Sequence, residues 1–171
     1  MKKNNLCSLS APAIGYDKRI FCVDFKDSEI KTFINPILTQ VKGLSLSKEA
    51  CTSIPGKQFI RPRNTDLTII YQRPLGQIET RQVTGMAAFV IQHEIDHLDG
   101  LLLSDIGLEV DDDFDKATEE EREEIINMYL DSLDLKQKNL QKIIEDDPEA
   151  KEISDGIRFM EGVAKGEILT E

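Results

Sequence analysis

The chain has 171 residues, enough for one ordinary domain or for a small catalytic domain with an appendage. No apolar run approaches the roughly 18 residues of a membrane span, and no signal-peptide pattern opens the sequence, so we expect no membrane association. Three cysteines at scattered spacings do not form a disulfide framework, which predicts the cytoplasm or another reducing compartment.

The net charge of −11 is unevenly distributed. Residues 1–104 carry 13 basic and 10 acidic side chains, a sum of +3, whereas residues 105–171 carry 8 basic and 22 acidic ones, a sum of −14. We therefore expect a catalytic domain over 1–104 and an acidic helical extension over 105–171. Such an extension is poorly suited to a phosphate backbone, so DNA is not expected as a partner.

Short β-rich runs separated by turns dominate the first hundred residues. They predict strands at 19–25, 33–38, 67–72 and 78–83. A turn at Pro74-Leu75-Gly76 joins the last two runs as a hairpin, and the segment 61–64 breaks the pattern between strands.

After Thr84 the period of the apolar residues changes to that of a helix. Thr84 is the expected N-cap of a helix over about 85–99, and Gly100 is its expected stop. Apolar residues occur on nearly every side of this helix, so we expect it to be buried in the core. A buried helix is an unusual place for two histidines.

The acidic extension shows helical features of its own. Thr118 and Glu121 match a capping box, and apolar residues then recur at steps of three and four over about 119–145. This pattern predicts a long amphipathic helix. A second, shorter helix is expected to begin near Pro148.

The strongest chemical signal is His93-Glu94-Ile95-Asp96-His97. Residues four apart share one helix face, so both imidazoles can hold one metal ion while Glu94 lies beside a water on that ion. The alternative is two unrelated core histidines, but these are the only histidines in the chain. The third ligand could be a carboxylate or a cysteine. Cys51, in a stretch that reads as a loop, is modestly preferred over Cys7 and Cys22 on this evidence.

Three segments resemble the signature motifs of peptide deformylases. The segment 92–100, Gln-His-Glu-Ile-Asp-His-Leu-Asp-Gly, is similar to their third motif, and 49–55, Glu-Ala-Cys-Thr-Ser-Ile-Pro, is similar to their second. The segment 6–15, beginning Leu-Cys-Ser-Leu-Ser-Ala-Pro-Ala, resembles their first, Gly-φ-Gly-φ-Ala-Ala-Pro-Gln. The order and separations agree, and the resemblance covers residues 6 to about 104.

The resemblance implies an α+β fold in which antiparallel sheets surround the buried metal helix, followed by C-terminal helices. It implies hydrolysis of the N-formyl group from the N-terminal methionine of new polypeptides, with metal-bound water as nucleophile. The expected cofactor is one divalent transition metal, Fe²⁺, for which Zn²⁺, Ni²⁺ or Co²⁺ can substitute. The implied partners are N-formylmethionyl peptides, and the acidic extension predicts weak or absent ribosome docking.

The resemblance also assigns roles to residues. The implied metal ligands are Cys51, His93 and His97, and Glu94 is the implied general base. The backbone N–H of Thr52 is expected to stabilise the oxyanion. The residues expected at the substrate are Glu49, Ser8, Met86, Phe89 and Val90, the last three as candidates for the methionine pocket or as ordinary core residues.

The sequence departs from the family pattern in its first motif. The glutamine that donates a hydrogen bond to the formyl oxygen is Ala13 here, and loss of one such donor typically slows a reaction about 10²–10³-fold. Leu6, Ser8 and Ala50 stand in place of glycines. The family usually has a strand and a helix before this motif, and this sequence begins five residues ahead of it. Two further hypotheses therefore stay open: an amidase or peptidase of different specificity, and a metal-stabilised binding protein without turnover.

Overall fold

The structure is a computed structural model, and it describes residues 6–25 and 30–146. The chain divides into two compact units, residues 1–115 and 116–171. The first unit thus continues past the change in composition near Ser104, because strand β8 (Leu108–Val110) pairs with strand β5 (Ile54–Arg63).

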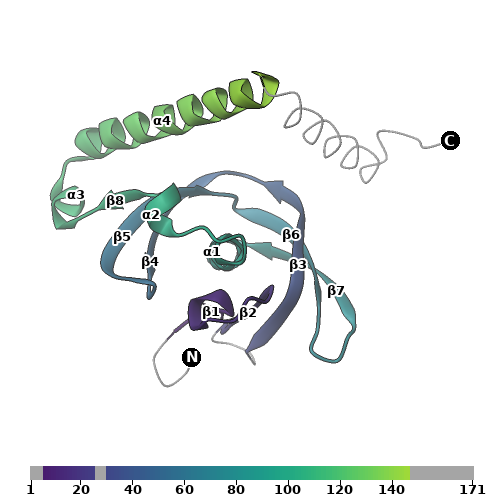
Figure 1. Ribbon diagram of the computed structural model, residues 1–171. Helices are drawn as coiled ribbons and strands as arrows, with labels where there is room; N and C mark the ends of the chain where they lie inside the picture. Colours follow the sequence, from purple (N-terminus) through teal and green to yellow (C-terminus); the bar gives the residue numbers. More distant parts are fainter. Residues whose placement is uncertain (1–5, 26–29, 147–171) are drawn as a thin grey trace. The chain divides into compact units, whose positions relative to one another are not determined.

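The first unit contains a five-stranded antiparallel sheet with the strand order β1-β2-β3-β6-β7 (Figure 1). Its strands are β1 (Ser8–Ser10), β2 (Ile20–Val23), β3 (Lys31–Lys42), β6 (Asp66–Gln72) and β7 (Ile78–Thr84). The four strands expected from the sequence correspond to β2, β3, β6 and β7. The short β1 carries too few residues to show a period and was not expected.

A second, three-stranded antiparallel sheet has the order β4-β5-β8, with β4 at Ser45–Cys51. Two expectations are corrected here. Cys51 ends a strand rather than lying in a loop, and the segment 61–64 does not separate strands, since β5 continues to Arg63. Pro62 is tolerated because it pairs with Leu46 on one side only, and the pairing of β8 with β5 stops at Ile60.

Helix α1 (Met86–Leu98) lies between the two sheets and contacts β1, β2, β5 and β7 (Figure 1). The expectation that Thr84 caps this helix is wrong, because Thr84 pairs with Asp66 at the end of β7 and Gly85 is the N-cap. The stop at Gly100 is confirmed: its φ is 77° and its N–H donates to the carbonyl of His97.

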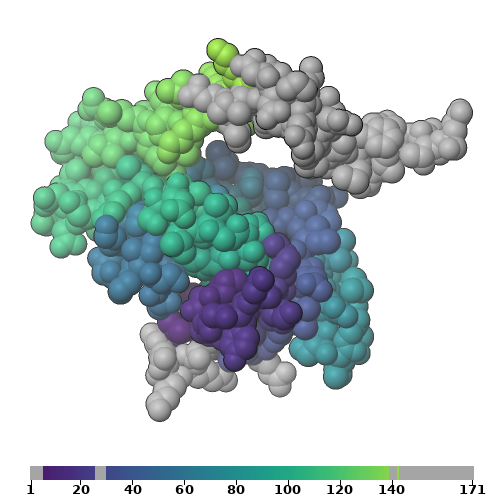
Figure 2. All heavy atoms as spheres, in the orientation of Figure 1, coloured from purple at the N-terminus to yellow at the C-terminus, as the bar shows by residue number. Residues whose placement is uncertain are grey.

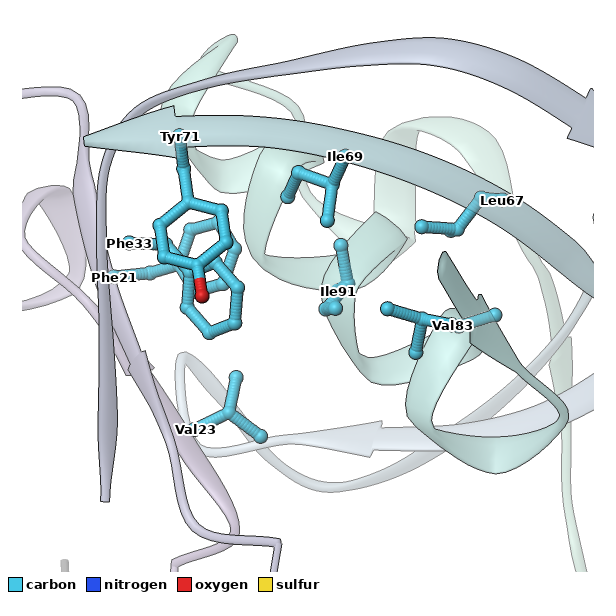
Figure 3. Packing of buried hydrophobic residues seen from close by; sticks show 9 residues of the cluster. Phe21, Val23, Phe33, Leu67, Ile69, Tyr71, Val83 and Ile91 are labelled. Atoms are coloured by element: carbon cyan, nitrogen blue, oxygen red, sulfur yellow. The ribbon is translucent and has the colours of Figure 1, made fainter. Parts of the chain in front are cut away.

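The core of the first unit forms where α1 packs on the five-stranded sheet (Figure 3). The rings of Phe21 and Phe33 stack with centroids 4.7 Å apart, and Tyr71 lies 4.4 Å from Phe33. Ile91 of α1 is fully buried beside Ile69 of β6. Burying each such side chain stabilises the fold by roughly 1.5–3 kcal/mol, so this contact holds α1 firmly in place.

Within the described residues up to Asp146, α1 is followed by the helices α2 (Leu103–Ile106), α3 (Asp112–Lys116) and α4 (Glu119–Asp146). The expected capping box before α4 is confirmed. The N–H of Thr118 donates to Glu121 over 2.8 Å, and the N–H of Glu121 donates to the Thr118 hydroxyl over 3.2 Å. The helix expected near Pro148 lies outside the described residues. None of the helices described is long and apolar enough to cross a membrane.

Candidate metal centre

Three donor atoms converge from two elements of the first unit. His93 and His97 lie one turn apart on α1, and Cys51 ends β4. Nε2 of His97 lies 3.2 Å from Nε2 of His93 and 3.2 Å from Sγ of Cys51. All three donor atoms lie within 4.8 Å of one another.

This spacing fits one metal ion. Bonds of about 2.0–2.3 Å in a tetrahedral arrangement place neighbouring ligand atoms roughly 3.3–3.6 Å apart, close to the separations of 3.2 Å seen here. One sulfur and two imidazole nitrogens suit a transition metal and not Mg²⁺ or Ca²⁺, which prefer oxygen. The donor set leaves room for a fourth, non-protein ligand.

The hairpin between β4 and β5 positions Cys51. Residues 52 and 53 form its turn, across which Cys51 pairs with Ile54. The register shifts between Ala50 and Cys51, a bulge-like irregularity of the kind that redirects side chains near functional sites. The N–H of Ser53 lies 3.4 Å from Sγ of Cys51 and donates to it, which further restrains the sulfur.

The charges of the three side chains are strongly coupled. Burial alone raises the pKa of the Cys51 thiol, but hydrogen bonds from His93 and His97 lower it to about 5. Burial lowers the pKa of His93, whereas hydrogen bonds to Cys51 and Glu49 raise it to about 10. The contact with Cys51 likewise raises the pKa of His97. Near neutral pH the sulfur is therefore a thiolate, the form that binds metals.

Glu49 of β4 orients His93. Oε2 of Glu49 lies 2.8 Å from Nδ1 of His93, while Arg63 reaches both oxygens of the same carboxylate at 2.7 and 2.9 Å. The sequence predicted that Glu49 contacts the substrate. In the structure both of its carboxylate oxygens contact protein side chains instead, those of Arg63 and His93. The arrangement directs Nε2 of His93 toward Cys51, the usual role of a carboxylate behind a ligating histidine.

Arg63 of β5 links the three-stranded sheet to helix α1. Its NH1 donates to Oδ2 of Asp96 over 2.6 Å, and its side chain is only 2% exposed. Arg61 lies 3.1 Å from the same oxygen. The contact of Arg63 with Asp96 was not predicted, because the sequence pattern indicated a break between strands at residues 61–64. The available signal was Asp96 itself, since an acidic residue in a core helix needs a cationic partner.

A small cavity of about 70 Å³ opens beside the donor atoms. Roughly 10–15 Å³ of such space suffices for one water, so the cavity has room for several waters or for a small group of a substrate. The cavity lining includes Glu94, Thr52, Ser8 and Ala13, together with the three donors. Its other lining residues are Leu6, Cys7, Leu9, Ser10, Ala50 and Ser53.

The three helix residues suggested for a methionine pocket do not line this cavity. Met86 is 71% exposed, Phe89 is half-buried, and Val90 packs against the hydrophobic core. Their contact with a substrate stays a prediction.

The N-terminal segment that carries β1 packs against α1, and Figure 2 shows this purple segment directly against the teal atoms of the first unit.

Two buried polar atoms of the cavity lining have no hydrogen-bond partner among the described residues. One is Oε2 of Glu94, in a residue 3% exposed, and the other is the hydroxyl of Ser10, in a residue 1% exposed. Leaving such a group unsatisfied costs about 1–3 kcal/mol. The role of Glu94 as general base stays a prediction. Sequence analysis did not single out Ser10.

Comparison with known proteins places this geometry in context. The chain matches the polypeptide deformylase family over residues 1–109. The peptide deformylase of Dictyoglomus turgidum is 37% identical over 109 residues, which cover 64% of this chain and 71% of that protein. The crystal structure of the Thermotoga maritima peptide deformylase superposes with a TM-score of 0.59 at 30% identity, covering 62% of this chain and 72% of that one. A Synechococcus elongatus peptide deformylase in complex with actinonin gives a TM-score of 0.56 at 30% identity, covering 59% and 56%.

Proposed function

This chain belongs to the polypeptide deformylase family, and we propose that it hydrolyses the N-formyl group from the N-terminal methionine of newly made polypeptides. One observation carries the proposal: Cys51, His93 and His97 bring their donor atoms together beside one cavity, which is also lined by Glu94, a residue with a buried carboxylate oxygen that has no partner among the described residues. Water and the formamide react to give formate and the free amine.

A divalent transition metal bound by the sulfur and the two imidazoles would supply a Lewis acid that acidifies water at neutral pH. Glu94 accepts the proton that the attacking water loses and later delivers a proton to the departing amine nitrogen. The backbone N–H of Thr52 donates to the carbonyl oxygen as negative charge develops there. Glu49 keeps the ring of His93 in register with Cys51 throughout.

We propose Fe²⁺ as the native ion, with Zn²⁺, Ni²⁺ or Co²⁺ as functional substitutes. One thiolate and two imidazoles support an ion of this softness. Cys51 is already a thiolate at neutral pH, so a metal ion of any of these kinds would displace a proton from His93, whose pKa is raised to about 10, and not from the sulfur.

We propose that the second unit binds ribosomal RNA weakly or not at all. Helix α4 carries nine acidic and four basic side chains, so its own charge opposes a phosphate backbone. Co-sedimentation with ribosomes at increasing salt tests this point. Tight binding that persists at high salt through α4 would contradict it.

Formate release tests the proposed function. Purified protein loaded with Fe²⁺ under anaerobic conditions is expected to release one formate per new amine from formyl-Met-Ala-Ser, and to leave acetyl-Met-Ala-Ser intact. Actinonin, the molecule bound in the Synechococcus elongatus relative, is expected to inhibit this release. Because Ala13 replaces the glutamine of the family motif, two other outcomes would contradict the proposal. Cleavage of other amides only would indicate a different hydrolase, and tight metal binding without turnover would indicate a binding protein.

A further inference from the structure

Ser10 and Ala13 both line the cavity; the buried hydroxyl of Ser10 has no hydrogen-bond partner among the described residues, and the side chain of Ala13 offers no donor. We propose that the Ser10 hydroxyl donates a hydrogen bond to the formyl oxygen of the substrate and so takes over the task that a side chain at residue 13 cannot perform in this chain. The inference rests on the proposed function and names a further catalytic residue for it.

The backbone around Ser10 fixes the direction of its side chain. Ser10 ends β1 and pairs with Phe21 of β2, and the next residue, Ala11, donates its N–H to the carbonyl of Ile20 over 2.9 Å. Ser8 and Ser10 lie on the same face of β1, because side chains alternate along a strand, and both residues line the cavity. The pairing of β1 with β2 therefore fixes the backbone of Ser10 before any substrate arrives.

The hydroxyl of Ser10 has no structural task among the described residues. The Ser8 hydroxyl lies 3.8 Å from the sulfur of Cys7, and the Thr32 hydroxyl lies 3.5 Å from the sulfur of Cys22. The Ser10 hydroxyl, in contrast, is buried at 1% exposure without a partner. A buried polar group in that state is costly unless it serves a ligand, and the first motif of the family has an alanine at this position.

Ser10 and Glu94 are complementary in chemistry. The carboxylate of Glu94 only accepts, which suits the water that must lose a proton. The hydroxyl of Ser10 can donate, which suits an oxygen that gains negative charge. A donor fixed in a buried cavity need not reorganise during the reaction, and this is the property that makes such donors effective.

The experiment compares Ser10→Ala with Ser47→Ala, which removes the hydroxyl of a buried serine outside the cavity lining. Metal content of each variant is measured first and is expected to match wild type. Ser10→Ala is expected to lower kcat for formyl-Met-Ala-Ser by about 10²-fold. Ser47→Ala is expected to keep kcat within twofold. Equal kcat for wild type and Ser10→Ala would overturn the inference and leave the deformylase proposal standing, whereas no formate from wild type would overturn both.

A rescue variant and a stability measurement exclude a merely structural role. Ala13→Gln is expected to restore kcat in the Ser10→Ala protein by at least tenfold and to change wild type by less. The thermal midpoint of the metal-free Ser10→Ala protein is expected to stay unchanged or rise, because an unpaired buried hydroxyl is removed. A lower midpoint, or equal gains from Ala13→Gln in both backgrounds, would show that Ser10 only supports the fold.

Discussion

Nδ1 of His93 lies 2.8 Å from Oε2 of Glu49, and this contact determines which nitrogen of the ring faces Cys51. The carboxylate is ionised, because hydrogen bonds from Arg63 and His93 overcome the effect of burial and lower the pKa of Glu49 to about 2. Nδ1 therefore keeps its proton, and the proton that His93 must lose when a metal binds leaves from Nε2.

Glu49→Gln is expected to weaken metal binding by about 10–100-fold, since the ring of His93 loses its charged partner. Competition with a chelator measures the change. Glu109→Gln removes one carboxylate from an exposed pair with Lys57 and is the matched control, with an affinity equal to wild type. Equal affinities in all three proteins would show that Glu49 does not position the ligand.

The metal-free protein is expected to lose stability in acid through Glu49. The unfolded carboxyl takes up its proton near pH 4.5, whereas the folded one stays charged until about pH 2. The stabilisation by this group is thus complete above about pH 4.5 and is lost as the pH falls toward 2, for a change of about 3 kcal/mol. Urea unfolding at several pH values measures it. The free energy of unfolding of Glu49→Gln is expected to fall less over this interval, and parallel curves would contradict the assignment.

Arg63→Met is expected to destabilise the protein by about 3–5 kcal/mol, because Glu49 and Asp96 are left as buried charges without their main partner. Denaturant unfolding provides the value. Lys57→Met, which breaks an exposed ion pair, is the control and should change stability by less than about 1 kcal/mol. A similar small loss for both variants would mean that Arg63 does not link α1 to the three-stranded sheet.

The sequence predicted the parts of the site that lie on one regular element. The four-residue spacing of His93 and His97 translates directly into a shared helix face, and α1 is where it was expected. The placement of Cys51 could not be worked out from local pattern, since it depends on a register shift in the β4–β5 hairpin. The local sequence favoured Cys51 only modestly over Cys7 and Cys22, and the family resemblance made the assignment definite.

The partners of the ligands were harder to predict. Glu49 and Arg63 meet α1 only because β4 and β5 pair with each other and pack beside it. Strand β5 was not predicted because it contains Pro62. A proline argues against a strand unless the neighbouring strand on one side has already ended, as β8 has here. Ser10 was not predicted as a site residue. It is distinguished only by a buried hydroxyl without a hydrogen-bond partner among the described residues, and no sequence pattern indicates this.

Glu94→Gln is expected to keep metal binding and to lower formate release by at least about 10²-fold, because the amide cannot accept the proton of water. Metal content and formate are measured on the same sample. Glu109→Gln again serves as control, with full activity. Substantial activity in Glu94→Gln would assign the base to another group.

The central claim is that one ion is held by one sulfur and two nitrogens of this chain. X-ray absorption at the metal edge, on protein containing one Fe²⁺ or Zn²⁺ per chain, tests it most directly. We expect one sulfur scatterer near 2.3 Å and light-atom scatterers near 2.0–2.1 Å, with the sulfur signal lost in Cys51→Ala. A spectrum without sulfur in the wild-type protein would contradict the account.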